Sequence, residues 1–433
     1  MDHLVREAKT IAGRIRVPGD KSISHRALIL GALAHGEIEI MGLSPGADVR
    51  STRRCLEALG VSFTEERSAV VVRGTGPEGL RAPTGPLDCG NSGTTMRLLA
   101  GVLAGRPFQS TLTGDSSLSR RPMGRIIRPL RLMGAKISAR QDSFAPLTIE
   151  GGALRGIHYE MEVKSAQVKS CILLAGLQAE GETVVREPSP SRDHTERLLR
   201  YLGAPIAVEG KSIRIKRGDL KARPIPVPGD FSSAAFFLAA AAALPGSELI
   251  VEDVGVNPTR TGLLEVLRRM GAEISLANER EVAGEPVADI RVQGKELSAV
   301  EVAGEIIPRL IDELPVLFAI ATQAEGETVV RDAAELRVKE TDRIAAIASE
   351  LRKLGAHVEE RPDGFVVEGP TRLVGARVDS HGDHRLAMSL AVAGLVAEGE
   401  TIVEGAECIG DSFPGFEETL RGLVNSAATD VGG

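Results

Sequence analysis

The sequence predicts an α/β protein of two similar lobes, each built from three copies of one repeated unit. Three observations support this prediction. The chain has 433 residues, which is long for a single hydrophobic core, so about two domains are expected. A fixed order of parts recurs six times: an alanine- and leucine-rich helix, a glycine turn, a β-branched strand and an amphipathic helix. The segment V-P-G-D occurs twice, at Val17 and again about 210 residues later at Val227.

The first helix of each unit is apolar almost all round, which predicts that it is buried. These six helices are expected within SISHRALILGAL, GTTMRLLAGVLA, SAQVKSCILLAGL, FSSAAFFLAAAAA, LPVLFAIATQA and HRLAMSLAVAGL. The second helix is amphipathic, as in TGLLEVLRRMGAEI, and ends at a glycine that can adopt a left-handed conformation. These glycines are Gly60, Gly134, Gly203, Gly271 and Gly355. The long period favours two closed lobes with a ligand cleft between them over an open array.

The two V-P-G-D segments predict where the chain passes from one lobe to the other. Proline and glycine set a bend at each place, and Asp20 and Asp230 are expected to cap or pin the turn. We therefore expect residues 1–19 and 229–433 to form one lobe and residues 20–228 to form an inserted lobe. Only the first turn is followed by lysine, histidine and arginine, which suggests that the first turn carries the chemistry.

Composition limits the class of partner. A formal net charge of −7 without a long basic run disfavours nucleic acid and anionic membranes. Small anionic substrates remain possible, because surface charge is screened beyond about 8 Å and a few cations can converge in a cleft. The N-terminus has no apolar signal core, and no apolar run is long enough to span a bilayer. The four cysteines lack metal-site spacing and indicate neither a zinc site nor a disulfide scaffold, so we expect a reducing, cytoplasmic location. We also expect a monomer that uses no metal or cofactor.

The start of the first repeat carries cations where an anion can bind. In PGDKSISHR, Lys21, Ser22 and Arg26 lie within the first turns of a predicted helix, whose free N–H groups and dipole attract anions. A lysine after a turn is more often simply solvated, so this motif alone is weak. In LDCGNSGTTMR, Asn91 and Gly93 open the next such helix, and glycine lets backbone N–H groups approach a ligand. A plain helix start would explain that motif equally well.

Further polar residues precede later helices. Arg121 stands directly before Pro122, which is expected to occupy the first position of a helix. Ser165 and Gln167 lie at a third helix start, and Ser191 follows in SPSRDH. These residues add donors at equivalent ends of repeated elements.

Two carboxylates of the second half are candidates for proton transfer. Asp312 stands at a predicted helix start among apolar residues, where burial would raise its pKa and a nearby cation would lower it. An N-cap role for Asp312 is also open, and Glu313 is expected to be solvated. Glu340 and Arg343 are spaced to share a helix face, although an ordinary surface ion pair would explain that spacing too.

The last apolar helix begins with Asp383, His384 and Arg385. Burying polar residues costs free energy unless they are paired, so their presence at this buried helix suggests a function. One acid and one base among several cations suit proton transfer on anionic substrates. Neither common nucleotide-binding glycine loop is present. The cations at equivalent ends of the repeats are Lys21, Arg26, Arg121, Lys339, Arg343 and Arg385.

Six motifs together resemble the 5-enolpyruvylshikimate-3-phosphate synthase family of enolpyruvyl transferases, over almost the whole chain. They are PGDKSISHRALIL, GNSGTTMR, RRPMG, SAQVKS, RVKETDR and GDHRLAM, in the order of that family. The resemblance implies two lobes of three βαβαββ units, an inverse α/β barrel, with the active site in the inter-lobe cleft. It implies transfer of the enolpyruvyl group of phosphoenolpyruvate to the 5-hydroxyl of shikimate 3-phosphate, with release of phosphate, on the pathway to chorismate and aromatic amino acids.

The same resemblance assigns roles to residues. Asp312 would take the proton from the attacking hydroxyl, while Glu340, helped by Lys21, would protonate the methylene carbon. The ligands of shikimate 3-phosphate would be Lys21, Ser22, Arg26, Ser165, Gln167, Ser191, Asp312 and Lys339. The ligands of phosphoenolpyruvate would be Lys21, Asn91, Gly93, Arg121, Gln167, Arg343 and Arg385.

The chain departs from the family pattern at four positions. Ala166 replaces a second serine, and Glu335 replaces an asparagine, which puts one contact with each part of the sugar phosphate in doubt. Asp411 stands where many members have a lysine, so no cation is assigned there. Leu98 replaces a proline of some members, which leaves sensitivity to phosphoenolpyruvate mimics open.

Two related activities and a non-catalytic role are alternatives. A transferase acting on UDP-N-acetylglucosamine would have a cysteine in the loop DSSLSRRP, which has none, and an asparagine in place of Ser22. An RNA 3'-phosphate cyclase would need nucleotide and RNA contacts that the acidic charge disfavours. A binding protein without activity is disfavoured because both candidate carboxylates are present.

Overall fold

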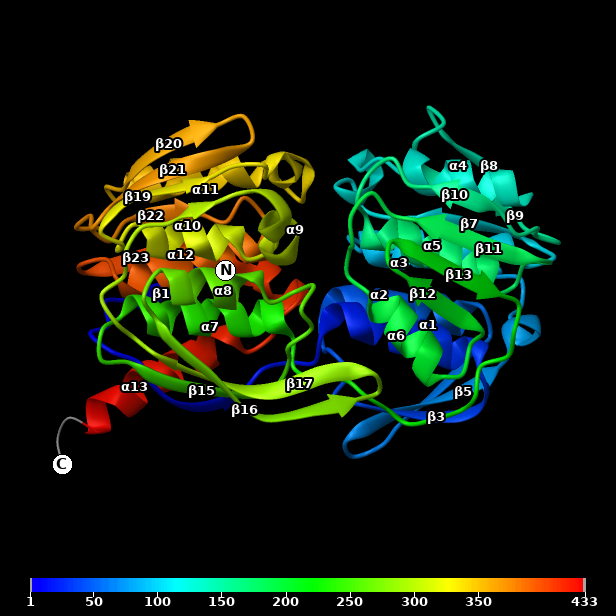
Figure 1. The fold of residues 1–433 in the computed structure, drawn as a ribbon, viewed down its shortest axis with the longest axis horizontal. Helices are drawn as coiled ribbons and strands as arrows, with labels where there is room; N and C mark the ends of the chain where they lie inside the picture. Colours follow the sequence, from blue (N-terminus) through cyan, green and yellow to red (C-terminus); the bar gives the residue numbers. More distant parts are fainter. Residues whose placement is uncertain (1, 431–433) are drawn as a thin grey trace. The chain divides into compact units, whose positions relative to one another are not determined.

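The computed structural model describes residues 2–430, which divide into two compact units (Figure 1). Unit 1 comprises the N-terminal segment up to Pro18, Pro228–Arg280 and the segment from Pro286 onward. Unit 2 comprises Gly19–Val227 together with Glu281–Glu285. The expected lobes differ from these units by one residue at each crossing. They also differ at Glu281–Glu285, a hairpin tip that was expected in the first lobe and groups with unit 2.

Unit 2 contains three four-stranded sheets of one design. In each sheet the first two strands are parallel and the last two are antiparallel to their neighbours. The first sheet is β14 (Ile225–Pro226), β3 (His35–Met41), β5 (Ala69–Thr75) and β4 (Ser62–Glu65). The second is β6 (Leu87–Asp88), β7 (Gln109–Thr113), β9 (Phe144–Glu150) and β8 (Lys136–Arg140). The third is β10 (His158–Glu160), β11 (Glu182–Arg186), β13 (Ser212–Lys216) and β12 (Ile206–Glu209).

The helices of unit 2 alternate between buried and amphipathic, as predicted. The buried helices are α1 (Lys21–Leu33), α3 (Gly93–Ala104) and α5 (Ala166–Gly176). The amphipathic helices are α2 (Ala47–Ala58), α4 (Gly124–Met133) and α6 (His194–Tyr201), and η1 (Pro77–Gly79) and η2 (Leu118–Arg120) are short 3-10 turns. Helices α3 and α5 pack closely, because a Cβ at Gly101 would lie only 2.2 Å from the carbonyl oxygen of Cys171. Their apolar faces form one core with α1.

Unit 1 repeats this design with a shorter last sheet. Its sheets are β2 (Ala12–Arg16), β15 (Glu248–Gly255), β17 (Glu285–Gln293) and β16 (Glu273–Val282); β18 (Glu301–Val302), β19 (Gly326–Val330), β21 (Gly364–Gly369) and β20 (His357–Arg361); and β22 (Arg377–Asp379), β23 (Glu400–Glu404) and β1 (His3–Arg6). Its buried helices, α7 (Phe231–Ala243), α10 (Leu314–Ala321) and α12 (His384–Leu395), contact one another (Figure 1). The remaining helices are α8 (Gly262–Arg269), α9 (Ile307–Leu310), α11 (Arg343–Lys353) and α13 (Phe416–Asp430), with 3-10 turns η3 (Gly304–Ile306), η4 (Ala334–Val338) and η5 (Ala406–Asp411).

Segments distant in the chain complete the first sheet of each unit and the last sheet of unit 1. In unit 1, β2 pairs in parallel with β15, and β1 pairs antiparallel with β23. In unit 2, β14 comes from the end of the unit and pairs in parallel with β3. Six βαβαββ-like repeats, three to a unit, therefore confirm the predicted α/β class. The predicted glycine helix ends are confirmed as well, since Gly60, Gly134, Gly203, Gly271 and Gly355 all have positive φ.

The two V-P-G-D turns have the predicted capping aspartates. The carboxylate of Asp20 accepts a hydrogen bond from the Ile23 amide at 2.8 Å, and that of Asp230 accepts one from the Ser232 amide at 2.8 Å. Only glycine fits at position 19, because a Cβ there would lie 1.7 Å from the Gly42 carbonyl oxygen. Across residues 2–430, every helix is too short or too polar to cross a bilayer.

Candidate functional site

The assigned residues of unit 2 gather where its buried helices begin. Helix α1 begins at Lys21, and the caps of α3 and α5 are Ser92 and Ser165, whose hydroxyls accept from the Thr95 and Val168 amides. Each start presents N–H groups that lack intrahelical partners, together with a partial positive charge. Pro122 departs from expectation: α4 begins two residues later, at Gly124.

The residues assigned to phosphoenolpyruvate in unit 2 come together at α3. The guanidinium of Arg121 donates to Asn91 Oδ1 at 2.5 Å, and Arg97 donates to Gln167 Oε1 at 2.6 Å. Between them lies Gly93, where a Cβ would be 2.7 Å from Arg97 Nη1 and 3.6 Å from Arg121 Nη1. A side chain at this position would therefore displace the Arg97 guanidinium and contact that of Arg121. Arg97 had no assigned role in the sequence, and its place beside Gln167 adds a second guanidinium to this group.

Lys21 is paired with an acid that sequence reasoning missed. Its Nζ lies 3.0 Å from Oδ2 of Asp48, in the first turn of α2, and both side chains are largely buried. The carboxylate compensates the ammonium charge, and an anionic ligand reaching Lys21 would share or replace it. Nothing in the local sequence links these two residues, which are 27 positions apart.

Arg26 is held almost entirely by protein atoms, with 4% of the residue exposed. Its Nε donates to Thr195 Oγ1 at 2.6 Å, its Nη2 donates to Ser170 Oγ at 2.9 Å, and its Nη1 donates to the Ser22 carbonyl at 2.8 Å. Burial lowers the pKa of Arg26 to about 10, with Glu196 opposing the effect, so the side chain stays charged at neutral pH. These bonds use three of its five N–H groups and leave two for a ligand.

In unit 1 the assigned acids gather around one buried cation. Arg343, 1% exposed, lies 2.7 Å from Asp383 Oδ2 and 2.6 Å from Glu340 Oε2, and its Nη1 is 3.5 Å from Asp312 Oδ1. Burial alone would lower the pKa of Arg343, but these three carboxylates outweigh burial and raise it. The structure therefore brings the two candidate catalytic acids, Asp312 and Glu340, to the same guanidinium.

The structure corrects two expectations about Glu340, that it shares a helix face with Arg343 and that the two form an ordinary surface ion pair. Helix α11 begins at Arg343, so Glu340 lies before the helix and meets Arg343 across the preceding turn, not along a helix face. Asp342 caps the helix by accepting from the Ala345 amide at 3.1 Å, which fixes where the helix starts. An ordinary surface ion pair is excluded, because Arg343 is fully buried.

Arg385 brackets Asp312 from the start of α12. Its Nη2 lies 3.7 Å from Asp312 Oδ2, and its Nη1 donates to the Asp312 carbonyl at 3.2 Å. Asp312 is not the N-cap of α10, since that position belongs to Glu313. Glu313 was expected to be solvated, and that expectation is wrong: it is 1% exposed and accepts from the Ser232 hydroxyl. Ser232 follows the second V-P-G-D turn, and the Arg385 guanidinium lies 3.9 Å from the same Glu313 oxygen, so the buried carboxylate contacts both a hydroxyl and a cation.

Lys339, the remaining assigned residue of unit 1, contacts an acid where the family pattern has an amide. Its Nζ donates to Glu335 Oε1 at 2.8 Å, one helical turn away at η4. Glu335, the residue that departs from the family pattern, is therefore the ion-pair partner of Lys339, an assigned ligand of shikimate 3-phosphate. The structure thus forms two groups of assigned residues, one within each unit.

His25, in the middle of the first motif, makes the stability of the fold depend on pH. Its Nδ1 lies 2.6 Å from Thr52 Oγ1, and burial lowers its pKa to about 3 from the ordinary value of 6.5. The folded protein keeps this ring neutral, whereas the unfolded chain binds a proton below pH 6.5. His25 therefore destabilises the fold progressively as the pH falls from 6.5 towards 3.

Between pH 7 and pH 5.5, we expect the free energy of unfolding of the wild type to fall by about 1 kcal/mol more than that of His25→Gln. Urea titrations at the two pH values measure this difference. His158→Gln, at an exposed histidine of β10 in the same unit, serves as the control. An unchanged pH dependence in His25→Gln would show that this ring is not buried in its neutral form.

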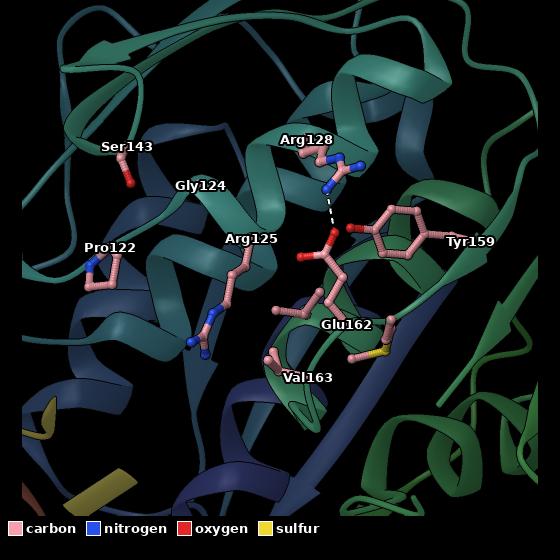
Figure 2. Close-up of a pocket in the computed structure, with 10 residues that line it drawn as sticks. Pro122, Gly124, Arg125, Arg128, Ser143, Tyr159, Glu162 and Val163 are labelled. Atoms are coloured by element: carbon pink, nitrogen blue, oxygen red, sulfur yellow. Dashed lines mark hydrogen bonds and ion pairs between the residues drawn. The ribbon is translucent and has the colours of Figure 1, made fainter. Parts of the chain in front are cut away.

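A cavity of about 320 Å³ lies beside α4 (Figure 2), and its lining includes Pro122 and Val168, the neighbours of Arg121 and Gln167 in the chain. It is lined by side chains that include Arg125, Arg128, Tyr159 and Glu162, and Arg128 is already paired with Glu162. No residue assigned to either substrate lines it. We therefore do not place a substrate there, because the assigned cations converge at the helix starts instead.

Comparison with known proteins agrees with the motifs. The profile of EPSP synthase (3-phosphoshikimate 1-carboxyvinyltransferase) matches residues 5–420. A 3-phosphoshikimate 1-carboxyvinyltransferase of Pelotomaculum thermopropionicum is 57% identical over 98% of this chain and 99% of its own, and one of Brevibacillus brevis is 54% identical over 96% and 98%. A solved EPSP synthase of Acinetobacter baumannii is 45% identical, with a TM-score of 0.88 and 98% of each chain covered. The chain therefore belongs to the EPSP synthase (3-phosphoshikimate 1-carboxyvinyltransferase) family.

Proposed function

We infer that this protein transfers the enolpyruvyl group of phosphoenolpyruvate to the 5-hydroxyl of shikimate 3-phosphate and releases phosphate. The observation that carries this inference is the placement of Asp312 and Glu340 on one buried guanidinium, Arg343, in a chain of this family. Both substrates are anions, and both groups of assigned residues are rich in cations. The reaction belongs to the pathway to chorismate and the aromatic amino acids.

We propose that shikimate 3-phosphate binds at the starts of α1 and α5 and at the loop before α6. Lys21 and Arg26 supply positive charge there, and the helix starts supply N–H donors for phosphate oxygens. The full set of proposed ligands is Lys21, Ser22, Arg26, Ser165, Gln167, Ser191, Asp312 and Lys339. With Ala166 following Ser165, the α5 start offers a backbone N–H in place of a second hydroxyl.

Phosphoenolpyruvate is proposed to bind through guanidinium groups of both units. Arg121, Arg343 and Arg385 match its carboxylate and phosphate, because a guanidinium can donate two parallel hydrogen bonds. Lys21, Asn91, Gly93 and Gln167 complete this set. Each unit therefore holds only part of either proposed ligand set.

In the proposed mechanism, Asp312 takes the proton of the 5-hydroxyl as the oxygen attacks C2 of phosphoenolpyruvate. Glu340, helped by Lys21, delivers a proton to the C3 methylene, which gives a tetrahedral adduct. The adduct then loses a proton from the new methyl group together with phosphate, and the enol ether forms. Cations around the departing phosphate stabilise the charge that develops on it.

The alternatives receive less support. The relatives named above are 3-phosphoshikimate 1-carboxyvinyltransferases, and loop 115–122 has no cysteine for the reaction on UDP-N-acetylglucosamine. An RNA 3'-phosphate cyclase remains disfavoured by the acidic charge. We further propose that the protein acts in the cytoplasm as a monomer and needs neither metal nor cofactor.

Phosphate release from phosphoenolpyruvate tests this function. Release is expected only when shikimate 3-phosphate is present, because the acceptor hydroxyl must attack before phosphate can leave. UDP-N-acetylglucosamine serves as the control acceptor and should give background release. Release with the nucleotide sugar, and none with shikimate 3-phosphate, would favour the alternative transferase.

A further inference from the structure

Two buried hydroxyls that have no assigned role hold the side chain of Arg26. Thr195 Oγ1 accepts from Arg26 Nε at 2.6 Å, and Ser170 Oγ accepts from Arg26 Nη2 at 2.9 Å. The two hydroxyls also lie 2.6 Å from each other, and neither residue is exposed. One residue of α5 and one of α6 therefore fix the Arg26 guanidinium, together with the Ser22 carbonyl of its own helix, which accepts from Nη1.

A buried ion cluster braces the two helices that carry these hydroxyls. Lys169, next to Ser170 in α5 and 1% exposed, lies 2.6 Å from Glu196 Oε1 and 2.9 Å from Glu187 Oε2. Glu196 directly follows Thr195 in α6. Burial raises the pKa of Glu196, and Lys169 opposes that effect, so the ammonium favours the ionised carboxylate. A charge so deeply buried is costly unless paired, and here the pairing fixes α6 against α5.

The same cluster reaches Ser191, another proposed ligand. The Ser191 hydroxyl donates to Glu187 Oε1, and Lys169 Nζ donates to the Ser191 carbonyl at 3.5 Å. Arg121 and Asn91, which are proposed only for phosphoenolpyruvate, hydrogen bond to each other. The cluster therefore contacts Ser191, a residue proposed only for shikimate 3-phosphate, whereas the Arg121–Asn91 pair belongs to the phosphoenolpyruvate set.

We propose that Thr195 and Ser170 are positioning residues for shikimate 3-phosphate. Thr195 and Ser170 orient Arg26 without touching the substrate. The Lys169 cluster holds α5 and α6, and with them these two hydroxyls, in a fixed relative position. Because Arg26 is a ligand only in the proposed function, this inference rests on that function. An arginine that loses a buried acceptor keeps its charge but leaves one N–H unsatisfied, and its remaining donors lose their fixed direction.

The test replaces Thr195 in two ways. Thr195→Val keeps the shape and removes the acceptor, and it is expected to weaken binding of shikimate 3-phosphate about 10-fold, with the KM for phosphoenolpyruvate and kcat within about twofold. Thr195→Ser keeps the hydroxyl and is expected to restore near wild-type affinity. Titration calorimetry with shikimate 3-phosphate and steady-state phosphate release measure these quantities on the full chain.

Thr183→Val is the matched control for removing a buried threonine hydroxyl. Thr183 lies in β11 of the same unit, and within residues 2–430 its hydroxyl has no hydrogen-bond partner. This variant should bind shikimate 3-phosphate as the wild type does. If Thr183→Val weakens binding as much as Thr195→Val, the effect comes from general destabilisation and the inference is overturned.

A double-mutant cycle with Arg26→Lys separates this inference from the proposed function. If Thr195 acts through Arg26, Thr195→Val adds less than twofold once Arg26 is lysine. Full additivity, or an unaffected Thr195→Val while Arg26→Lys binds poorly, would overturn the positioning role and leave the proposed function in place. Normal binding by Arg26→Lys would instead contradict the ligand assignment of the proposed function.

Discussion

Asp312→Ala and Glu340→Ala are each expected to lower kcat about 100-fold or more, the usual contribution of a positioned general acid or base. The physical reason is that, in the proposed mechanism, these two carboxylates exchange protons with the substrate, and both contact the same guanidinium, Arg343. Phosphate release with both substrates saturating measures the effect. Circular dichroism and thermal unfolding should show the fold intact.

Three further variants sharpen this prediction. Asp312→Asn and Glu340→Gln keep the shape of each side chain and should be nearly as impaired, because the missing function is proton exchange and not volume. Glu359→Ala removes an exposed carboxylate of the same unit and should keep turnover within about twofold, as surface changes usually do. Near-normal turnover in an Asp312 or Glu340 variant would remove that residue from the mechanism.

Arg343→Met is expected to abolish measurable turnover and to lower the free energy of unfolding by about 3–5 kcal/mol. The substitution keeps an unbranched side chain but leaves Asp383, which is fully buried, without its cation. It also removes the group that gathers Asp312 and Glu340. Urea unfolding measures the stability, and phosphate release measures the activity.

The double variant Arg343→Met, Asp383→Asn is the control for this explanation. Neutralising Asp383 should recover part of the lost stability, because an uncompensated buried charge costs more than a buried amide. Turnover should stay lost, since the proposed phosphoenolpyruvate ligand is still missing. A wild-type stability in Arg343→Met alone would contradict the buried ion cluster.

Much of the fold could be predicted because its signals are local in the chain. Apolar helices such as 231–243, glycine helix ends such as Gly271 and capping aspartates such as Asp20 depend on residues within a few positions. The six repeats made the architecture readable, since each copy shows the same order of parts. The grouping of the hairpin tip Glu281–Glu285 with unit 2 was not predicted, because no local sequence pattern shows to which unit a hairpin tip belongs.

The assignment of site residues stays a prediction, and the pairings of those residues could not be predicted from the sequence. Motifs and resemblance identified Lys21 and Arg26, yet their partners Asp48 and Thr195 lie 27 and 169 positions away. Lys169 carried a weak signal, a charge within an apolar helix, that could have drawn attention to the buried cluster.

The sequence alone was therefore sufficient to predict the fold class, the six repeats and the glycine helix ends. Only the tertiary structure decided that Glu313 is buried, that Glu340 precedes its helix and that one guanidinium serves three acids. The physical reason is that helix periodicity and turn chemistry depend on neighbours in the chain, whereas burial and charge pairing depend on neighbours in space. In this protein the two sets of neighbours differ most where the chemistry is proposed to occur.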